Sequence, residues 1–146
     1  MRENTGKVAL VGAGPGDTGL LTLKGEKYIK QADCLVYDRL SSPEFLSMAK
    51  AGCELIYVGK ENHKHVMKQD AINEILYEKS KYHELVVRLK GGDPYVFGRG
   101  GEEALYLVDR NVEVEVVPGV SSSVAALAAA GIPITHRGIA KGFQVI

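Results

Sequence analysis

Short apolar runs alternate with amphipathic segments along most of the chain. Residues 7–12 (KVALVG) form a nearly continuous apolar run that ends at a glycine, which predicts a strand buried on both faces of a sheet. Similar runs predict strands at residues 33–37, 54–58, 84–89 and 112–117. Helices are expected at residues 22–31, 42–50, 68–81, 101–110 and 121–130. The alternation indicates an α/β fold, with a five-stranded, mostly parallel sheet flanked by helices.

The last expected helix and the residues after it differ from the rest. Residues 121–130 are small and apolar, which predicts a buried helix, and a G-I-P stop signal follows it. The chain turns apolar again at Phe143, Val145 and Ile146, as at the start of another strand. Because an unpaired strand edge is a liability, we expect either that the sequence continues into a further domain or that these residues pair with another chain.

Composition and charge exclude several classes of protein. The 18 Lys and Arg residues balance 18 Asp and Glu, which argues against binding to nucleic acid or a membrane surface by bulk electrostatics. The polar first residues and the lack of a membrane-length apolar run predict a cytoplasmic protein. Cys34 and Cys53 lack a C-x-x-C spacing and are expected to be reduced residues in or near the core. His63 and His65 lack a third ligand at a recognisable spacing, so no metal is expected.

Glycine is the one unusual count, at 17 of 146 residues, against an average usage of about 7%. Glycines and polar residues follow every predicted strand, and the carboxyl ends of parallel strands meet at one edge where ligands bind. These groups are Gly12 to Asp17, Asp38 with Arg39, Gly59 with Lys60, Gly91 to Pro94, and Pro118 to Ser123. Each group alone also fits a turn, a helix cap or a solvated ion pair. Their convergence favours a shared ligand site.

The first of these groups partly matches a dinucleotide fingerprint. Gly12 and Gly14, with Asp38 after the second strand, follow the start of G-x-G-x-x-G. The third glycine is displaced, however, and Asp17 stands in its place, where a carboxylate would repel a pyrophosphate. Pro15 also removes a backbone donor from the loop. A nicotinamide-dependent oxidoreductase is therefore a minor alternative. A phosphate loop and a G-x-S-x-G elbow are absent from the sequence.

A series of longer motifs covers most of the chain in order. They are VGAGPGD (11–17), LLTLKG (20–25), VYDRL (36–40), VGK (58–60), VVRLKGGDPYVFGRGGEE (86–103), VVPGVSS (116–122) and GIPITHRG (131–138). Together they resemble the tetrapyrrole methylases, and the similarity runs from about Gly6 to the last residue. GPGD and GGDP are shared by that family. RLKGGDP-x-x-FGRGGEE and GIP-x-THR are typical of its members that methylate uroporphyrinogen III.

This resemblance implies a two-domain protein. Residues 1–135 would be its amino-terminal α/β domain, and residues 136–146 a linker and the start of a carboxyl-terminal domain that this chain lacks. The implied reaction is methyl transfer from S-adenosylmethionine to carbons 2 and 7 of uroporphyrinogen III, which gives precorrin-2 for sirohaem and cobalamin and S-adenosylhomocysteine as the other product. Such proteins bind the cofactor between their two domains and are expected to be homodimers. A non-catalytic fragment that dimerises through apolar surface is the second hypothesis.

The resemblance also carries roles onto particular residues. The implied proton acceptor is Asp38, and the implied proton donor is Lys60. Cofactor contacts are implied at Pro15, Gly91, Gly92, Asp93, Val96, Ser121 and Ser122, where the last two replace a more usual Thr-Ala. Because the substrate carries several carboxylates, Arg39, Arg99 and Arg137 are candidates to hold its rim.

Overall fold

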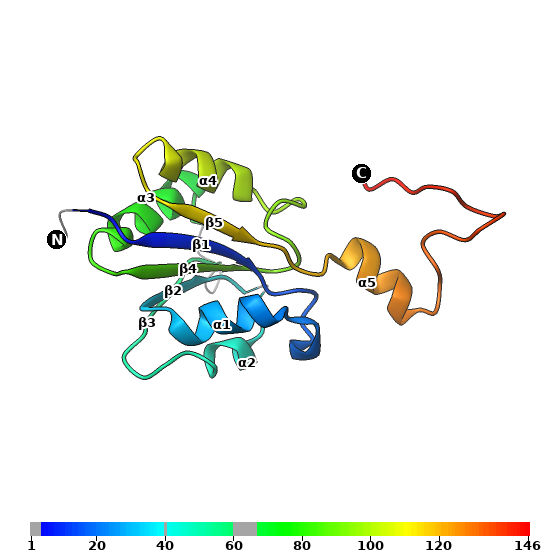
Figure 1. The fold of residues 1–146 in the computed structure, drawn as a ribbon, viewed down its shortest axis with the longest axis horizontal. Helices are drawn as coiled ribbons and strands as arrows, with labels where there is room; N and C mark the ends of the chain where they lie inside the picture. The colour runs from blue at the N-terminus through cyan, green and yellow to red at the C-terminus, as the bar shows by residue number, and fades with distance from the viewer. Residues whose placement is uncertain (1–3, 40, 60–66) are drawn as a thin grey trace.

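The centre of the protein is a parallel sheet (Figure 1). The computed structural model describes residues 4–39, 41–59 and 67–146. In that part of the chain the sheet has five strands in the spatial order β3-β2-β4-β1-β5, and all neighbours are parallel. The strands are β1 (Lys7–Gly12), β2 (Cys34–Tyr37), β3 (Glu54–Tyr57), β4 (Leu85–Lys90) and β5 (Val114–Val117). The expected α/β class and five-stranded sheet are confirmed.

The helices follow the expected order, with small shifts at their ends. They are the 3-10 helix η1 (Thr18–Leu20) and the α-helices α1 (Leu23–Gln31), α2 (Pro43–Leu46), α3 (Gln69–Ser80), α4 (Gly100–Val108) and α5 (Ser122–Ala129). Helix α2 is shorter than the expected 42–50. Its last turns tighten, because Met48 N donates to Phe45 O and Ala49 N donates to Leu46 O.

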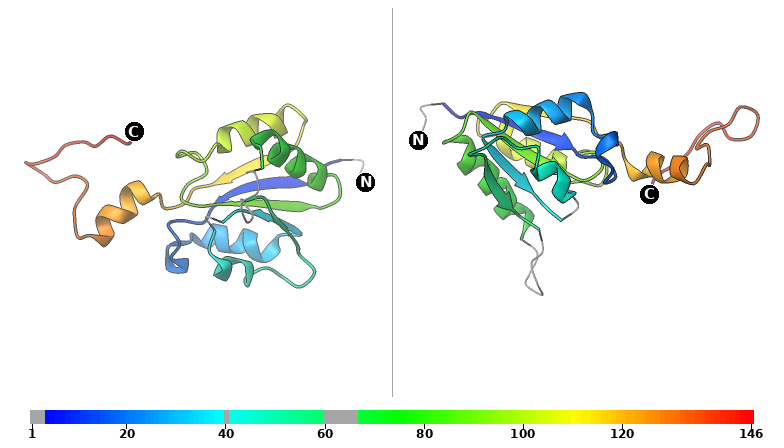
Figure 2. Two further views of the ribbon diagram at one scale, coloured as in Figure 1. Left: turned by 180° about the vertical axis from the view of Figure 1, so that it is seen from behind. Right: turned by 90° about the horizontal axis from the view of Figure 1, so that it is seen from below.

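Two helical layers cover the two faces of the sheet (Figures 1 and 2). Helices α1 and α2 lie on one face, where Ile29 and Phe45 share a buried apolar cluster with Ala9 and Val11 of β1. Helices α3 and α4 lie on the other face, and their buried residues share a cluster with the alternate β1 residues. Strand β1 is therefore buried on both sides, as its apolar run predicts.

The strand order places an opening between β2 and β4. Strand β2 leads to α2 on one face, whereas its neighbour β4 leads to α4 on the other face. Loops that leave two adjacent strands in opposite directions leave a crevice at the carboxyl ends, and this is where ligands of open α/β sheets bind. The topology thus selects one edge of the sheet for function.

The expectation of a buried helix at residues 121–130 was wrong for α5. This helix leads away from the sheet (Figure 1), none of its residues is buried, and Val124 is 46% exposed. Its small apolar residues need a covering surface that the described residues do not supply. The apolar end of the chain likewise forms no strand within the described residues, and Phe143 and Ile146 are exposed. No helix in the described ranges is both long and apolar enough to cross a membrane.

Three glycines bring the loops after β1, β4 and β5 into backbone contact. A Cβ on Gly119 would overlap the carbonyl oxygen of Gly92 and lie 2.8 Å from Gly12 Cα. A Cβ on Gly12 would lie 2.6 Å from Gly119 N and from Gly92 O. Backbone atoms that cannot move independently exclude a side chain at Gly12 and Gly119, whereas Gly92 contributes the carbonyl oxygen that both positions approach.

We expect Gly119→Ala to lower the free energy of unfolding by roughly 1–3 kcal/mol, because the added methyl group overpacks a rigid contact. Gly101→Ala is the matched control, since a Cβ there meets nothing within 4 Å. That change in an exposed helical turn is expected to be neutral or to stabilise by up to about 1 kcal/mol. Urea unfolding measures the free energy of unfolding of both variants. Equal values for the two would show that the backbone contact at Gly119 leaves room for a Cβ.

Candidate functional site

A cavity of about 600 Å³ opens at the carboxyl ends of the strands. Its size lies in the usual range for small-molecule sites. Its walls come from the loops after β1, β2, β3 and β4 and from the start of α5. Among the lining residues are Gly14, Pro15, Asp38, Arg39, Gly59, Gly91, Gly92, Asp93, Val96, Arg99, Ser121 and Ser122. Groups that are far apart in the sequence therefore share one cavity, as the strand-end pattern predicts.

Most of the residues singled out in the sequence lie at this cavity. All seven of the expected cofactor residues line it, together with Asp38, Arg39 and Arg99. Arg137 does not line it and is exposed in the segment after α5. Lys60, His63 and His65 lie outside the described residues. The roles of all these residues stay predictions.

Backbone hydrogen bonds hold the glycine loops of the cavity together. Gly14 N donates to Gly92 O at 3.2 Å, and Gly92 N donates to Gly14 O at 2.8 Å. The Asp93 carboxylate accepts from Gly119 N and from Tyr95 N, each at 2.9 Å. Asp93 is thus a turn residue and also the tie between the loops that follow β4 and β5. It leaves further carboxylate lone pairs for a ligand.

A second, more apolar hollow of about 680 Å³ adjoins the cavity. The two share Asp93, Val96, Phe97 and Ser121. Phe143 and Val145 also line the second hollow, so the apolar end of the chain lies near the site. Together the two spaces offer a more polar and a more apolar compartment that share part of their lining.

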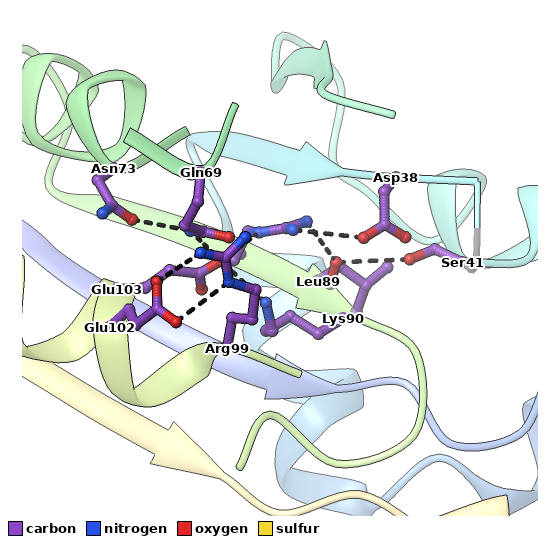
Figure 3. A network of polar contacts seen from close by, with 10 residues as sticks. Asp38, Ser41, Gln69, Asn73, Leu89, Lys90, Arg99, Glu102 and Glu103 are labelled. Atoms are coloured by element: carbon purple, nitrogen blue, oxygen red, sulfur yellow. Dashed lines mark hydrogen bonds and ion pairs between the residues drawn. The ribbon is translucent and has the colours of Figure 1, made fainter. Parts of the chain in front are cut away.

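A buried charged cluster lies beneath the cavity, between β4 and α4 (Figure 3). The Glu103 side chain has no exposed area, and the side chains of Arg88 and Lys90 are 4% and 6% exposed. Glu103 Oε1 accepts from Lys90 Nζ at 2.8 Å and from Arg88 Nε at 3.3 Å. Gln69 Nε2 of α3 donates to the same oxygen at 3.3 Å. One carboxylate oxygen therefore collects donors from β4 and α3.

Arg88 connects this cluster to Asp38. Its NH2 group lies 3.3 Å from Asp38 Oδ2, and its NH1 group donates to the carbonyl oxygen of Leu89 at 3.1 Å. Asp38 stands at the cavity wall, and its side chain is 20% exposed. The guanidinium is thus held through Nε and NH1, and it contacts Asp38 through its NH2 group alone.

Burial is the main cause that lowers the pKa of Lys90 below its usual value, and the positive charge of Arg88 acts in the same direction. The charge of Glu103 and its hydrogen bond to Lys90 oppose that shift, as does the charge of Asp38. The buried carboxylate thus favours a charged ammonium at the cavity floor.

Arg88, Lys90 and Glu103 were not among the expected site residues, although all three stand in the motif at residues 86–103. A signal was present: Arg88 and Lys90 are alternate residues of a strand, so they share a face with Val86, which belongs to the core. Two cations on a face that is otherwise apolar require a buried anion opposite them. Glu103, in the first turn of α4, supplies it.

The rim of the cavity carries a second ion pair and unusual backbone. Arg99 donates to Glu102 through Nε at 3.1 Å and through NH2 at 2.8 Å, and both side chains are exposed. Phe97 and Arg99 have left-handed φ values of 51° and 56°, which non-glycine residues seldom adopt. Such conformations cluster at ligand sites, where neighbouring structure enforces them.

A Cys-Glu-His group lies at the opposite end of the sheet. Possible ligand atoms of Cys34, Glu54 and His83 lie within 4.8 Å of one another. Burial raises the pKa of the Cys34 thiol to about 12, and the Glu54 carboxylate is bound by Lys79 at 2.5 Å and by His83 at 2.8 Å. The group is a core thiol beside an ion-paired carboxylate, and we assign no metal to it.

The loop after β1 differs from that of a dinucleotide-binding fold. Helix η1 intervenes, and α1 begins only at Leu23. Asp17 caps η1 by accepting from Gly19 N at 2.8 Å. In a dinucleotide fold the glycine loop leads directly into the helix whose amino end binds the pyrophosphate. The geometry therefore disfavours the nicotinamide alternative.

The sequence model of the tetrapyrrole (corrin/porphyrin) methylases matches residues 7–143. The chain belongs to this family. It is 60% identical over 142 residues to a uroporphyrinogen-III C-methyltransferase of Methanocaldococcus jannaschii, covering 97% of this chain and 59% of that protein. It is 52% identical to siroheme synthase 2 of Yersinia enterocolitica, covering 99% of this chain and 30% of that protein.

A solved structure agrees with this membership. The crystal structure of a Thermus thermophilus uroporphyrin-III C-methyltransferase, complexed with S-adenosylhomocysteine, superposes with a TM-score of 0.79 at 51% identity. It covers 94% of this chain and 57% of that one. The chain thus spans somewhat more than half the length of these methyltransferases. Because the chain belongs to this family, we no longer consider the alternative of a nicotinamide-dependent oxidoreductase.

We expect Asp93→Ala to lower the free energy of unfolding by roughly 1–3 kcal/mol, because two backbone N–H groups lose a charged acceptor. Hydrogen exchange at the Gly119 amide should become faster in the same variant. Asp109→Ala, at the exposed end of α4, is the control and is expected to stay within about 0.5 kcal/mol. Unchanged exchange at Gly119 would show that Asp93 does not tie the two loops.

Proposed function

We propose that this chain is the amino-terminal part of an S-adenosylmethionine-dependent methyltransferase. The complete protein methylates carbons 2 and 7 of uroporphyrinogen III and forms precorrin-2 for sirohaem and cobalamin synthesis. The observation that carries the proposal is the shared cavity, where the family's cofactor positions meet Asp38 at one edge of the sheet. The names of the two methyltransferase relatives support the same activity.

The cavity and the adjoining hollow fit the proposed cofactor. Gly91 and Gly92 expose backbone to the cavity, and the φ of 62° at Gly92 suits glycine. Asp93 and Ser121 offer polar atoms, and Val96 offers an apolar side chain to both spaces. We therefore assign cofactor binding to Pro15, Gly91, Gly92, Asp93, Val96, Ser121 and Ser122. When bound, S-adenosylmethionine supplies an electrophilic methyl group on a sulfonium.

The chain's own residues contribute orientation, exclusion of water and proton transfer. Attack by an electron-rich pyrrole carbon requires no nucleophilic side chain, so positioning is the main task of the protein. The methylated macrocycle must then release a proton, and the Asp38 carboxylate at the cavity wall accepts it. We keep Lys60 as the proposed donor from the sequence resemblance.

Arginines at the cavity suit a substrate that carries several carboxylates. Arg39 and Arg99 line the cavity and bind the rim of the macrocycle in this proposal. Arg137 is proposed to reach the substrate from the segment after α5. Arg88 and Lys90 are both paired with the buried Glu103, and Arg88 also with Asp38, so we do not assign them to the substrate carboxylates.

Domain organisation and assembly extend this proposal. Residues 1–135 form one domain, and residues 136–146 lead into a further domain that completes the cofactor site. Exposed apolar residues along this segment, such as Ile139 and Phe143, suit contact with that domain. We also propose that the complete protein is a cytoplasmic homodimer, and sedimentation at several concentrations tests that state.

Replacing Asp38 tests the reaction. In the protein expressed from its complete reading frame, we expect Asp38→Ala to lower kcat by about 10²–10⁴-fold, because a positioned base is lost. The Kd for S-adenosylhomocysteine, measured by calorimetry, should stay within about threefold because Asp38 does not belong to the cofactor set.

Asp109→Ala provides the control for the loss of one surface carboxylate, and its turnover should match the wild type. Unchanged turnover in Asp38→Ala would remove Asp38 from the mechanism. A wild-type protein that does not methylate uroporphyrinogen III would reject the proposed function itself.

A further inference from the structure

The buried carboxylate beneath the cavity has a role that the proposed reaction does not yet use. We propose that Glu103 is a positioning residue for methyl transfer: it holds the Arg88 guanidinium, which in turn fixes the Asp38 carboxylate at the cavity wall. The inference rests on the proposed function, because it takes Asp38 as the proton acceptor.

Glu103 acts from behind the cavity. Arg88, Lys90 and Asp38 line the cavity, whereas Glu103 does not, and its side chain has no exposed area. Its Oε1 atom binds Arg88 Nε at 3.3 Å, and the NH2 group of the same guanidinium lies 3.3 Å from Asp38 Oδ2. Any effect of Glu103 on the reaction must therefore pass through the cavity-lining groups that it binds, which are Arg88, Lys90 and Gln69. Of these three, Arg88 contacts Asp38 directly.

Stability does not account for this cluster. Burying charges is costly, and replacing a buried ion pair or triad with apolar residues is often neutral or stabilising. Here the cost is raised further, because Glu103 Oε2 is buried without a hydrogen-bond partner among the described residues. Val86 and Leu107, on the same two elements, are buried members of the apolar cluster on this face. An apolar core suits these positions, so the charges point to a function at the adjacent cavity.

The groups around Lys90 give a second, independent readout. Arg88 of its own strand, Glu103 of α4 and Asp38 after β2 are the charged groups that shift its pKa most, and the field of Glu102 on α4 also reaches its ammonium. Burial and Arg88 lower the pKa of Lys90, whereas Glu103 and Asp38 raise it. Removing the charge of Glu103 must therefore lower that pKa further. An NMR titration of the Lys90 side chain detects the change without any turnover.

A double-mutant cycle on the protein from its complete reading frame tests the coupling. We expect Glu103→Gln to lower kcat about tenfold when Asp38 is present, and by less than about twofold in the Asp38→Ala background. The KM for S-adenosylmethionine should change little in either case. Glu26→Gln removes an exposed carboxylate that pairs with Lys30 on α1, and this control should leave kcat unchanged. Glu103→Asp keeps the charge but shortens the reach, and serves in the same cycle if Glu103→Gln does not fold.

The outcomes separate the two proposals. A wild-type enzyme that is active and loses activity in Asp38→Ala supports the proposed function, and only the Glu103 variants then decide this inference. Unchanged kcat in Glu103→Gln, or an equal loss with and without Asp38, would overturn it. So would an unaltered Lys90 pKa in that variant, because Glu103 would then not face the cavity cations in solution. Inactive wild-type enzyme would reject both proposals together.

Discussion

The carboxyl ends of five parallel strands meet at one edge of the sheet, and the candidate site depends on this constraint. The loops after β2 and β4 leave toward opposite faces, which opens a crevice between them. The loops after β1, β4 and β5 close on each other through backbone contacts that leave no room for a Cβ on Gly12 or Gly119. The cavity is therefore a product of strand direction, connection direction and close backbone approach.

The same edge of the sheet also holds buried charges that are costly for stability and that lie next to the candidate site. Strand β4 is buried on both faces, yet two of its last three residues are cations. Their partner, Glu103, has one oxygen shared among three donors and the other without a hydrogen bond in the described part of the chain. An arrangement of this kind holds charged groups in one position next to a cavity. That rigidity suits a reaction in which the protein mainly orients its reactants.

Much of this architecture could be predicted from the sequence, because local patterns match the final environments. The KVALVG run becomes a strand buried on both faces, and the glycine and aspartate groups after the strands line one cavity. The prediction that α5 is buried was wrong, because small apolar residues lead to burial only when a covering surface exists, and the described residues provide none for α5. Arg88, Lys90 and Glu103 were not singled out, because their pairing depends on α4 packing over β4. Nothing in local spacing brings residues 88 and 103 together.

The longer motifs add what local physics cannot give, which is membership of the tetrapyrrole methylase family. The reaction that we propose from this membership and from the shared cavity is the transfer of methyl groups to two carbons of a tetrapyrrole. Mass spectrometry of uroporphyrinogen III, incubated with S-adenosylmethionine and the protein from its complete reading frame, tests this reaction directly. We expect a product that has gained two methyl groups, and a macrocycle recovered without any added methyl group would rule out the proposed reaction.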